Sequence, residues 1–122
     1  MGYQKYTELD VWKQAKDLAS FIYELTSTFP KAEQFGLVSQ MRRCVVSVPS
    51  NIAEGCGRQH LKETIQFLNI ARGSLYELET QIFISKDLNF INDEQLEDAI
   101  LRIEALGKLI NGFIRYQNSK LS

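Results

Sequence analysis

The chain has 122 residues, of which 44% are hydrophobic and 24% are charged. A chain of this length fits one domain spanning residues 1–122 that buries about two-thirds of its unfolded surface, so it needs neither a disulfide nor a metal for stability. The 14 basic and 15 acidic residues give a formal net charge of −1. The overall charge therefore does not indicate a nucleic-acid-binding protein.

The first predicted helix covers residues 8 to 28. Thr7 is a suitable N-cap by residue type. Glu8 and Asp10 follow it in the first turn, where carboxylates meet free N–H groups and the positive end of the helix dipole. Apolar residues then recur every three or four positions, which is the helical period. They are Leu9, Trp12, Ala15, Leu18, Ala19, Ile22, Leu25 and Phe29. The Phe29-Pro30 pair ends this helix.

The second predicted helix starts between Lys31 and Glu33 and runs toward Gly55. Gly55 and Gly57 can supply the left-handed conformation that often ends a helix. Pro49 lies inside the helix and removes one backbone hydrogen bond. We expect Pro49 to kink the helix, or else to break it, with Asn51 and Glu54 forming a capping box for a short extra helix.

Two further helices complete an all-α, up-down-up-down four-helix bundle with a proline-kinked second helix. The third runs from His60 to Asp87 and ends near Asn89, and Phe67, Ile70 and Phe83 widen its apolar face. The fourth begins at Asp93 and Glu94, and its tail is expected to fray beyond Tyr116. Several apolar residues lie off the core faces, which favours self-association. They are Val46, Ala53, Leu101, Ala105 and Leu109.

One face of the second helix is rich in small hydrogen-bonding groups. On an ideal helix these residues fall within an arc of about 100°, opposite the apolar face. We call them the polar stripe: Gln40, Arg43, Ser47, Ser50, Asn51, Glu54 and Arg58. A helix that only filled a core would not need such a face. The polar stripe, together with Pro49, is therefore the predicted interaction surface.

The sequence carries no constellation typical of an enzyme. His60 is the single histidine, and no Glu-x-x-His pair, phosphate loop or marked triad accompanies it. Cys44 and Cys56 are twelve positions apart, a spacing that indicates two buried thiols rather than a zinc or redox site. We therefore expect no catalytic residue, no metal and no cofactor.

Residues 42–72 are the basic part of the chain, with five basic and two acidic residues, while the segments before and after them are net acidic. Arg43 and Arg58 are expected to pair with Glu54 in a buried seam, as arginines at a subunit contact commonly do. Alternatively, arginines in this region bind phosphates of a nucleic acid. We assign such a contact to Arg42, Lys62 and Arg72.

The order of motifs along the chain resembles a known bacterial family over residues 6 to 116. The motifs are Phe29-Pro30, Glu33, Phe35-Gly36-Leu37, Gln40, Arg43, Ser47-Val48-Pro49-Ser50-Asn51-Ile52-Ala53-Glu54-Gly55, Gly57-Arg58, Phe67-Leu68, Ile70-Ala71-Arg72-Gly73-Ser74-Leu75 and Glu77-Leu78-Glu79. They resemble the four-helix-bundle family of 23S ribosomal RNA intervening-sequence proteins, which includes the accessory variability determinant of diversity-generating retroelements. The resemblance implies a barrel-like homopentamer, and the retroelement member implies contacts with nucleic acid and a reverse transcriptase.

The sequence thus predicts a non-enzymatic, oligomeric accessory protein whose partners are copies of itself and RNA, DNA or a nucleic-acid-processing protein. A purely protein-binding scaffold is the alternative, because the net charge is close to zero. The polar N-terminus does not resemble a secretory signal, and no apolar run approaches the roughly 18 residues of a membrane span. We therefore expect a cytoplasmic location and no membrane partner.

Overall fold

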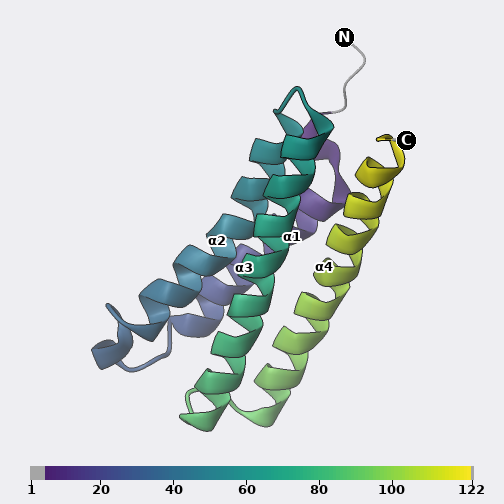
Figure 1. The fold of residues 1–122 in the computed structure, drawn as a ribbon. Helices are drawn as coiled ribbons and strands as arrows, with labels where there is room; N and C mark the ends of the chain where they lie inside the picture. Colours follow the sequence, from purple (N-terminus) through teal and green to yellow (C-terminus); the bar gives the residue numbers. More distant parts are fainter. Residues whose placement is uncertain (1–4, 122) are drawn as a thin grey trace.

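The computed structural model describes residues 5–121, and this part of the chain forms four long helices and no strand. They are α1 (Asp10–Thr26), α2 (Leu37–Cys56), α3 (Leu61–Asp87) and α4 (Asp93–Ser119), with short 3-10 helices η1 (Tyr6–Glu8) and η2 (Lys31–Glu33) before α1 and α2. Successive helices run in opposite directions (Figure 1). The predicted all-helical fold with four helices is confirmed.

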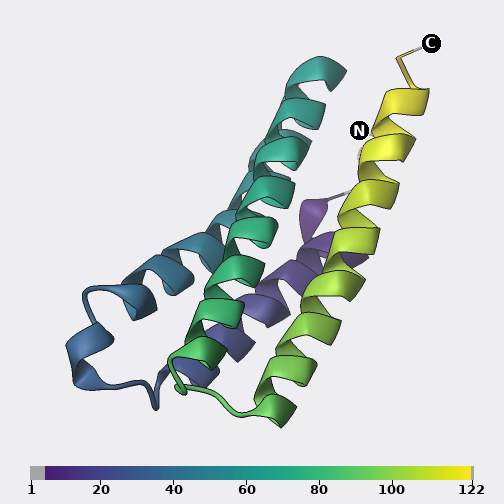
Figure 2. The ribbon, with the colours of Figure 1, turned by 60° about the horizontal axis from the view of Figure 1, so that its bottom comes forward.

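The helices pack in chain order, so α2 contacts α1 and α3, and α4 contacts α3 and α1. Figure 2 shows the turns between α1 and α2 and between α3 and α4 at the same end of the bundle. The predicted apolar faces meet in one core, because residues spaced three or four apart lie on one side of a helix. The fully buried side chains at its centre include Ile22, Val48, Leu75, Ile82 and Leu106.

The start of α1 differs from the prediction. Thr7 does not cap the helix, because it lies inside η1, and Leu9 precedes α1 without a side-chain cap. The ring of Tyr6 packs edge-on against Trp12 with centroids 5.4 Å apart. This contact fixes the 3-10 turn on the first turn of α1, so the helix begins two residues later than predicted.

Helix α2 continues through Pro49, which is buried. The alternative of a break at Pro49 is therefore wrong, and Asn51 forms no cap: its side-chain amide donates to the Ser47 carbonyl oxygen one turn back, at 2.8 Å. A proline has no N–H to donate to the carbonyl one turn earlier. A helix can continue through the proline where the structure tolerates that missing hydrogen bond. The kink at Pro49 and the pentameric assembly stay predictions.

The prediction of left-handed glycines after α2 is also wrong. Gly57 caps the helix in a right-handed conformation (φ −85°), and no glycine in residues 5–121 has a positive φ. Position 55 requires a glycine for a different reason. A Cβ there would lie 3.1 Å from both Phe67 Cβ and the Thr64 carbonyl oxygen. A glycine therefore lets the end of α2 approach the start of α3 closely.

Helix α3 ends as predicted near Asn89, which has a φ of 63°. The Phe90 N–H donates to the Ser85 carbonyl at 2.9 Å, and the Asn89 N–H donates to the Lys86 carbonyl at 2.9 Å. These two bonds are the Schellman motif that closes a helix. Ile70 and Phe83 do not widen the core face as predicted, because their side chains are 46% and 47% exposed.

Helix α4 begins at Asp93, as predicted, behind an Asn92 cap that exchanges hydrogen bonds with Gln95 at 2.8 Å in both directions. It continues to Ser119, so the tail does not fray directly beyond Tyr116 as expected. The reason is that Gln117 is buried and Ile114 packs in the core, which holds the last turns against the bundle.

Candidate interaction surface

The centre of the polar stripe contacts α3 through a short chain of hydrogen bonds. The Ser47 and Ser74 hydroxyl oxygens lie 2.9 Å apart, and the Asn51 side-chain amide donates to the Ser47 hydroxyl at 3.0 Å. The Cys44 thiol donates to the Ser74 carbonyl oxygen at 2.9 Å. Ser47 and Asn51 are half-buried. This part of the stripe therefore joins α2 to α3 within one chain.

The rest of the polar stripe faces away from the core. Gln40, Arg43 and Ser50 are exposed, and no ion pair of Arg43 forms within residues 5–121. Arg43 and Glu54 are eleven positions apart on one helix, which separates them by about 16 Å along its axis. The expected Arg43–Glu54 pair is therefore absent from the described residues, for a geometric reason.

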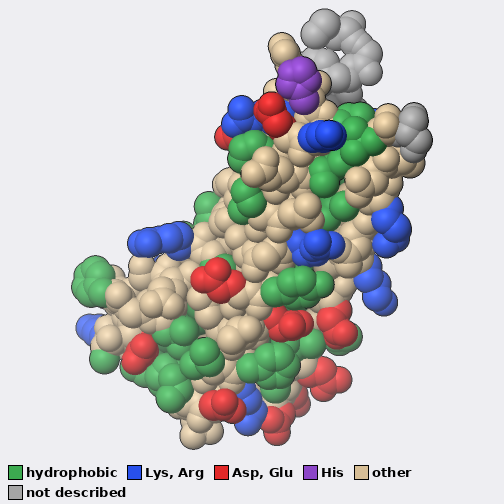
Figure 3. Space-filling model, viewed as in Figure 1, with side chains coloured by type: hydrophobic (Ala, Val, Ile, Leu, Met, Phe, Trp, Pro, Cys, Tyr) green, Lys and Arg blue, Asp and Glu red, His purple; other side chains and the backbone are tan. Residues whose placement is uncertain are grey.

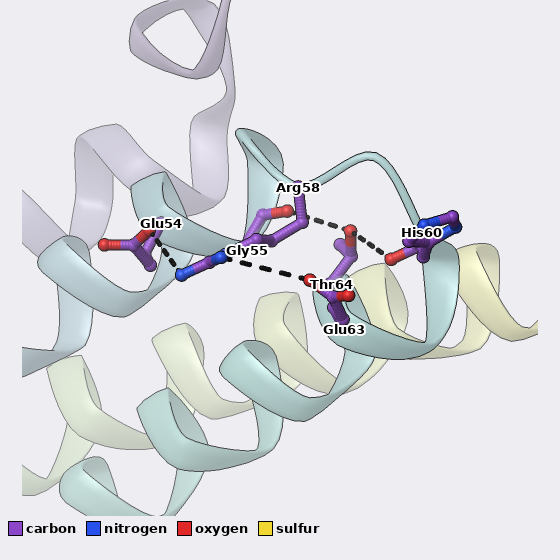
Figure 4. A network of polar contacts seen from close by, with 6 residues as sticks. All are labelled: Glu54, Gly55, Arg58, His60, Glu63 and Thr64. Carbon is purple, nitrogen blue, oxygen red and sulfur yellow. Dashed lines mark hydrogen bonds and ion pairs between the residues drawn. The ribbon is translucent and has the colours of Figure 1, made fainter.

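The expected Arg58–Glu54 pair does form, at the end of α2. The Arg58 Nη2 and Glu54 Oε2 atoms are 3.0 Å apart, and Arg58 Nη1 lies 3.9 Å from a Glu63 carboxylate oxygen (Figure 4). The guanidinium also covers the Phe67 ring at 4.7 Å. The Arg58 and Glu54 side chains are 40% and 54% exposed. Within one chain this pair is at the surface, where such pairs contribute at most about 1 kcal/mol.

Beneath this pair, a buried hydrogen bond ties the two helices together. The Thr64 hydroxyl donates to the Gly55 carbonyl oxygen at 2.8 Å (Figure 4). That carbonyl belongs to the last turn of α2 and also accepts from the Arg58 N–H at 3.2 Å, just past the end of the helix. Thr64 thus adds a second, shorter hydrogen bond to a buried acceptor at the place where Gly55 allows close approach. The turn that carries Arg58 is therefore held rigidly on α3.

The three predicted nucleic-acid contacts lie on different parts of the bundle. Arg42 is at the α1–α2 seam: Nε donates to Thr26 Oγ1 at 3.0 Å, Nη2 to the Tyr23 carbonyl at 3.2 Å, and the guanidinium covers the Tyr23 ring at 4.5 Å. Lys62 is exposed at the opposite end, in the first turn of α3. The structure does not bring these two together.

Arg72, the third candidate, is at the α3–α4 seam. Its Nη1 donates to Asn111 Oδ1 at 3.0 Å and its Nη2 to Asn69 Oδ1 at 2.8 Å. Arg42 and Arg72 thus already donate several hydrogen bonds inside the chain. Arg43 and Lys62 are the members of this basic segment whose charged groups have no ion-pair or hydrogen-bond partner among the described residues.

Three residues that complete these contacts were not singled out as site residues from the sequence: Ser74, Thr64 and Tyr23. Ser74 and Thr64 are ten positions apart on the side of α3 that faces α2, where each interrupts an apolar row. A hydroxyl in an apolar row is the signal that could have found them. Tyr23 had no such signal, since its partner Arg42 is on another helix.

Both cysteines sit in environments that favour the protonated thiol. Burial raises the pKa of Cys44 to about 11, and the negative charge of Glu77 adds to this effect. Burial also raises the pKa of Cys56, which is half-buried. The described residues contain no group of three or more His, Cys, Asp or Glu side chains that could hold a metal ion. No helix in residues 5–121 is long and apolar enough to cross a membrane.

Comparisons with known proteins place these observations in a family context. The family model described as 23S rRNA-intervening sequence protein matches residues 7–112. A crystal structure of a protein of unknown function from the S23 ribosomal protein family of Bacteroides thetaiotaomicron has a similar fold, with a TM-score of 0.76. It is 24% identical over 85% of this chain and 97% of that one. No curated protein matches the chain.

Proposed function

Because the chain belongs to the family of 23S rRNA-intervening sequence proteins, we propose that it is a non-enzymatic, self-associating accessory protein that binds RNA or a ribonucleoprotein in the cytoplasm. The family match carries this proposal, since its description names a ribosomal RNA context. The exposed charges of Arg43 and Lys62, which form no ion pair within residues 5–121, support it, because such cations on a helix can neutralise phosphates.

Self-association is the second part of the proposal. Large apolar side chains remain on the surface of the single chain, among them Ile70, Tyr76, Leu101 and Tyr116, each 46–61% exposed. Large exposed apolar side chains are candidates for a subunit contact where they lie along one edge of a helix, as Leu101 and Tyr116 do on α4. A homopentameric ring is the form that the family resemblance implies. In that ring the polar stripe and the Arg58–Glu54 pair would lie at a contact between copies.

A purely protein-binding scaffold is the second candidate. It is favoured by the internal hydrogen bonds of Arg42 and Arg72, which leave fewer guanidinium donors free for phosphates than the sequence indicates. A scaffold of this kind would bind a protein partner in the presence of nuclease and would bind RNA no better than a neutral control protein.

RNA binding is tested by fluorescence anisotropy with a labelled RNA stem-loop, titrated between about 50 and 200 mM salt. We expect the affinity to fall steeply with salt, and Lys62→Glu to weaken binding and reduce the slope of log K against log salt by about 1 for the lost phosphate contact. Lys62 is exposed at a helix start, so its replacement should leave the fold intact.

Lys13→Glu is the matched control, because it makes the same charge change at an exposed position of α1, outside the basic segment. It should leave the salt slope within error of the unaltered protein. Binding that is absent at the lowest salt concentration would reject the RNA proposal. Equal losses for Lys62→Glu and Lys13→Glu would show that the contact is not at the start of α3.

A further inference from the structure

Helix α4 carries a second apolar row outside its core face, along the edge of the helix next to α1. Its members are spaced by three or four residues, as on one face of a helix. They are Leu101, Ala105, Leu109, Gly112 and Tyr116. Leu101 and Tyr116 are 61% and 56% exposed, and Ala105 is exposed as well, whereas Leu109 and Gly112 are half-buried and Leu109 packs against the core. Ala105 and Gly112 are small, so another helix could approach α4 closely along this row.

The acidic residues of α4 lie in its first half, and its second half is basic. Residues 93–104 contain five acidic residues and one arginine, whereas residues 105–119 contain two basic residues and no acidic one. Figure 3 shows acidic side chains gathered over the start of α4, and Lys and Arg side chains farther along the same edge of the bundle. A helix with this distribution attracts a copy of itself that runs in the opposite direction.

Four of these charges lie beside the exposed apolar row, on one side of it. On an ideal helix Glu97, Glu104, Lys108 and Arg115 fall within an arc of about 40°. All four are exposed, and none forms an ion pair within residues 5–121. The bundle itself therefore gives these charges no partner of opposite sign.

Their positions are symmetric about Leu106. Glu97 and Arg115 are nine residues before and after it, and Glu104 and Lys108 are two before and after it. In an antiparallel pair of α4 helices centred near this residue, Glu97 lies opposite the partner's Arg115, and Glu104 lies opposite the partner's Lys108. A two-fold axis repeats each pairing, which gives four ion pairs along one side of the apolar row. A parallel pair in register would instead place like charges opposite one another.

We propose that two copies of this chain associate through an antiparallel, two-fold α4–α4 contact, in which the row Leu101, Ala105, Leu109, Gly112 and Tyr116 is buried beside the ion pairs. The inference rests on the self-association proposed above and identifies one of its surfaces. A two-fold contact uses the same patch on both copies and leaves the polar stripe on α2 free. The α4–α4 contact can therefore join two rings, or it can be the one contact that joins two copies.

The symmetry allows a mixing experiment with two variants of the full chain. Glu97→Lys combined with Glu104→Lys makes all four positions basic, and Lys108→Glu combined with Arg115→Glu makes all four acidic. In sedimentation velocity at low salt, each variant alone should have half the mass of the unaltered assembly, because like charges face each other. An equimolar mixture should recover the full mass, since every pair is then complementary.

The control is Glu8→Lys with Glu24→Lys, which makes the same charge change on exposed residues of η1 and α1 and should keep the full mass. Circular dichroism melts of all variants identify any loss of fold. If the unaltered protein is itself monomeric, both self-association and this contact are wrong. If it is oligomeric, and both variants keep its mass with no change on mixing, the α4 contact alone is wrong.

Discussion

Gly55→Val is expected to lower the free energy of unfolding by about 3 kcal/mol, the upper part of the range for overpacking. A Cβ at this position meets Phe67 Cβ and the Thr64 carbonyl oxygen at 3.1 Å each. The Thr64 contact is with backbone, which cannot rotate away. The valine also pushes apart the Thr64 hydroxyl and the Gly55 carbonyl, whose 2.8 Å hydrogen bond is buried. Urea unfolding followed by circular dichroism measures the change.

Gly57→Ala provides the comparison, two residues farther along. A Cβ there would lie at ordinary distances of 3.6 and 3.8 Å from the Glu54 and Ala53 carbonyl oxygens, and the φ of −85° suits any residue. Alanine there should leave stability unchanged within about 0.5 kcal/mol or raise it slightly. A Gly55→Val protein as stable as Gly57→Ala would contradict the close α2–α3 approach described here.

Arg42→Ala is expected to destabilise the fold by about 1 to 2 kcal/mol, although Arg42 was predicted from sequence as a phosphate contact. Its guanidinium donates to the hydroxyl of the buried Thr26 and to the Tyr23 carbonyl, in the last turn of α1. Carbonyls there lack later N–H donors, and a positive charge also favours that end of a helix. The expected loss is smaller than for a buried charged hydrogen bond, because the Arg42 side chain is half-exposed.

The neighbouring Arg43→Ala is the matched control, since it removes the same charge from an exposed side chain without an ion pair in the described residues. Thermal melts at low protein concentration should show a lower melting temperature for Arg42→Ala and almost none of that change for Arg43→Ala. The opposite order would mean that Arg43 holds the fold and that Arg42 is the free cation.

The helices and most of the core could be predicted from the sequence, because an apolar side chain every three or four residues requires a helix with one buried face. Leu75, Ile82 and Leu106 lie in the core for this reason. The roles of Thr7 and Gly55 could not be predicted. Thr7 is a good cap by type, but a Tyr6–Trp12 contact decides where α1 begins, and Gly55 is explained by a neighbour on another helix.

The candidate surface was predictable to a similar degree. One helix fixes which of its own residues share a face, so the polar stripe and the four-residue spacing of Glu54 and Arg58 followed from the sequence. The partners of these residues on other helices could not be predicted from the sequence. Thr26, Tyr23 and Asn111 bind Arg42 and Arg72 across packed seams, and only the fold shows that these arginines and Lys62 lie far from one another.

Both the interaction surface on α2 and the α4 contact depend on self-association of the chain. Sedimentation equilibrium on the full chain at micromolar concentration tests it directly. Five copies of the 14.0 kDa chain give about 70 kDa, and two rings joined through α4 give about twice that mass. A single species of 14.0 kDa across the concentration range would contradict self-association.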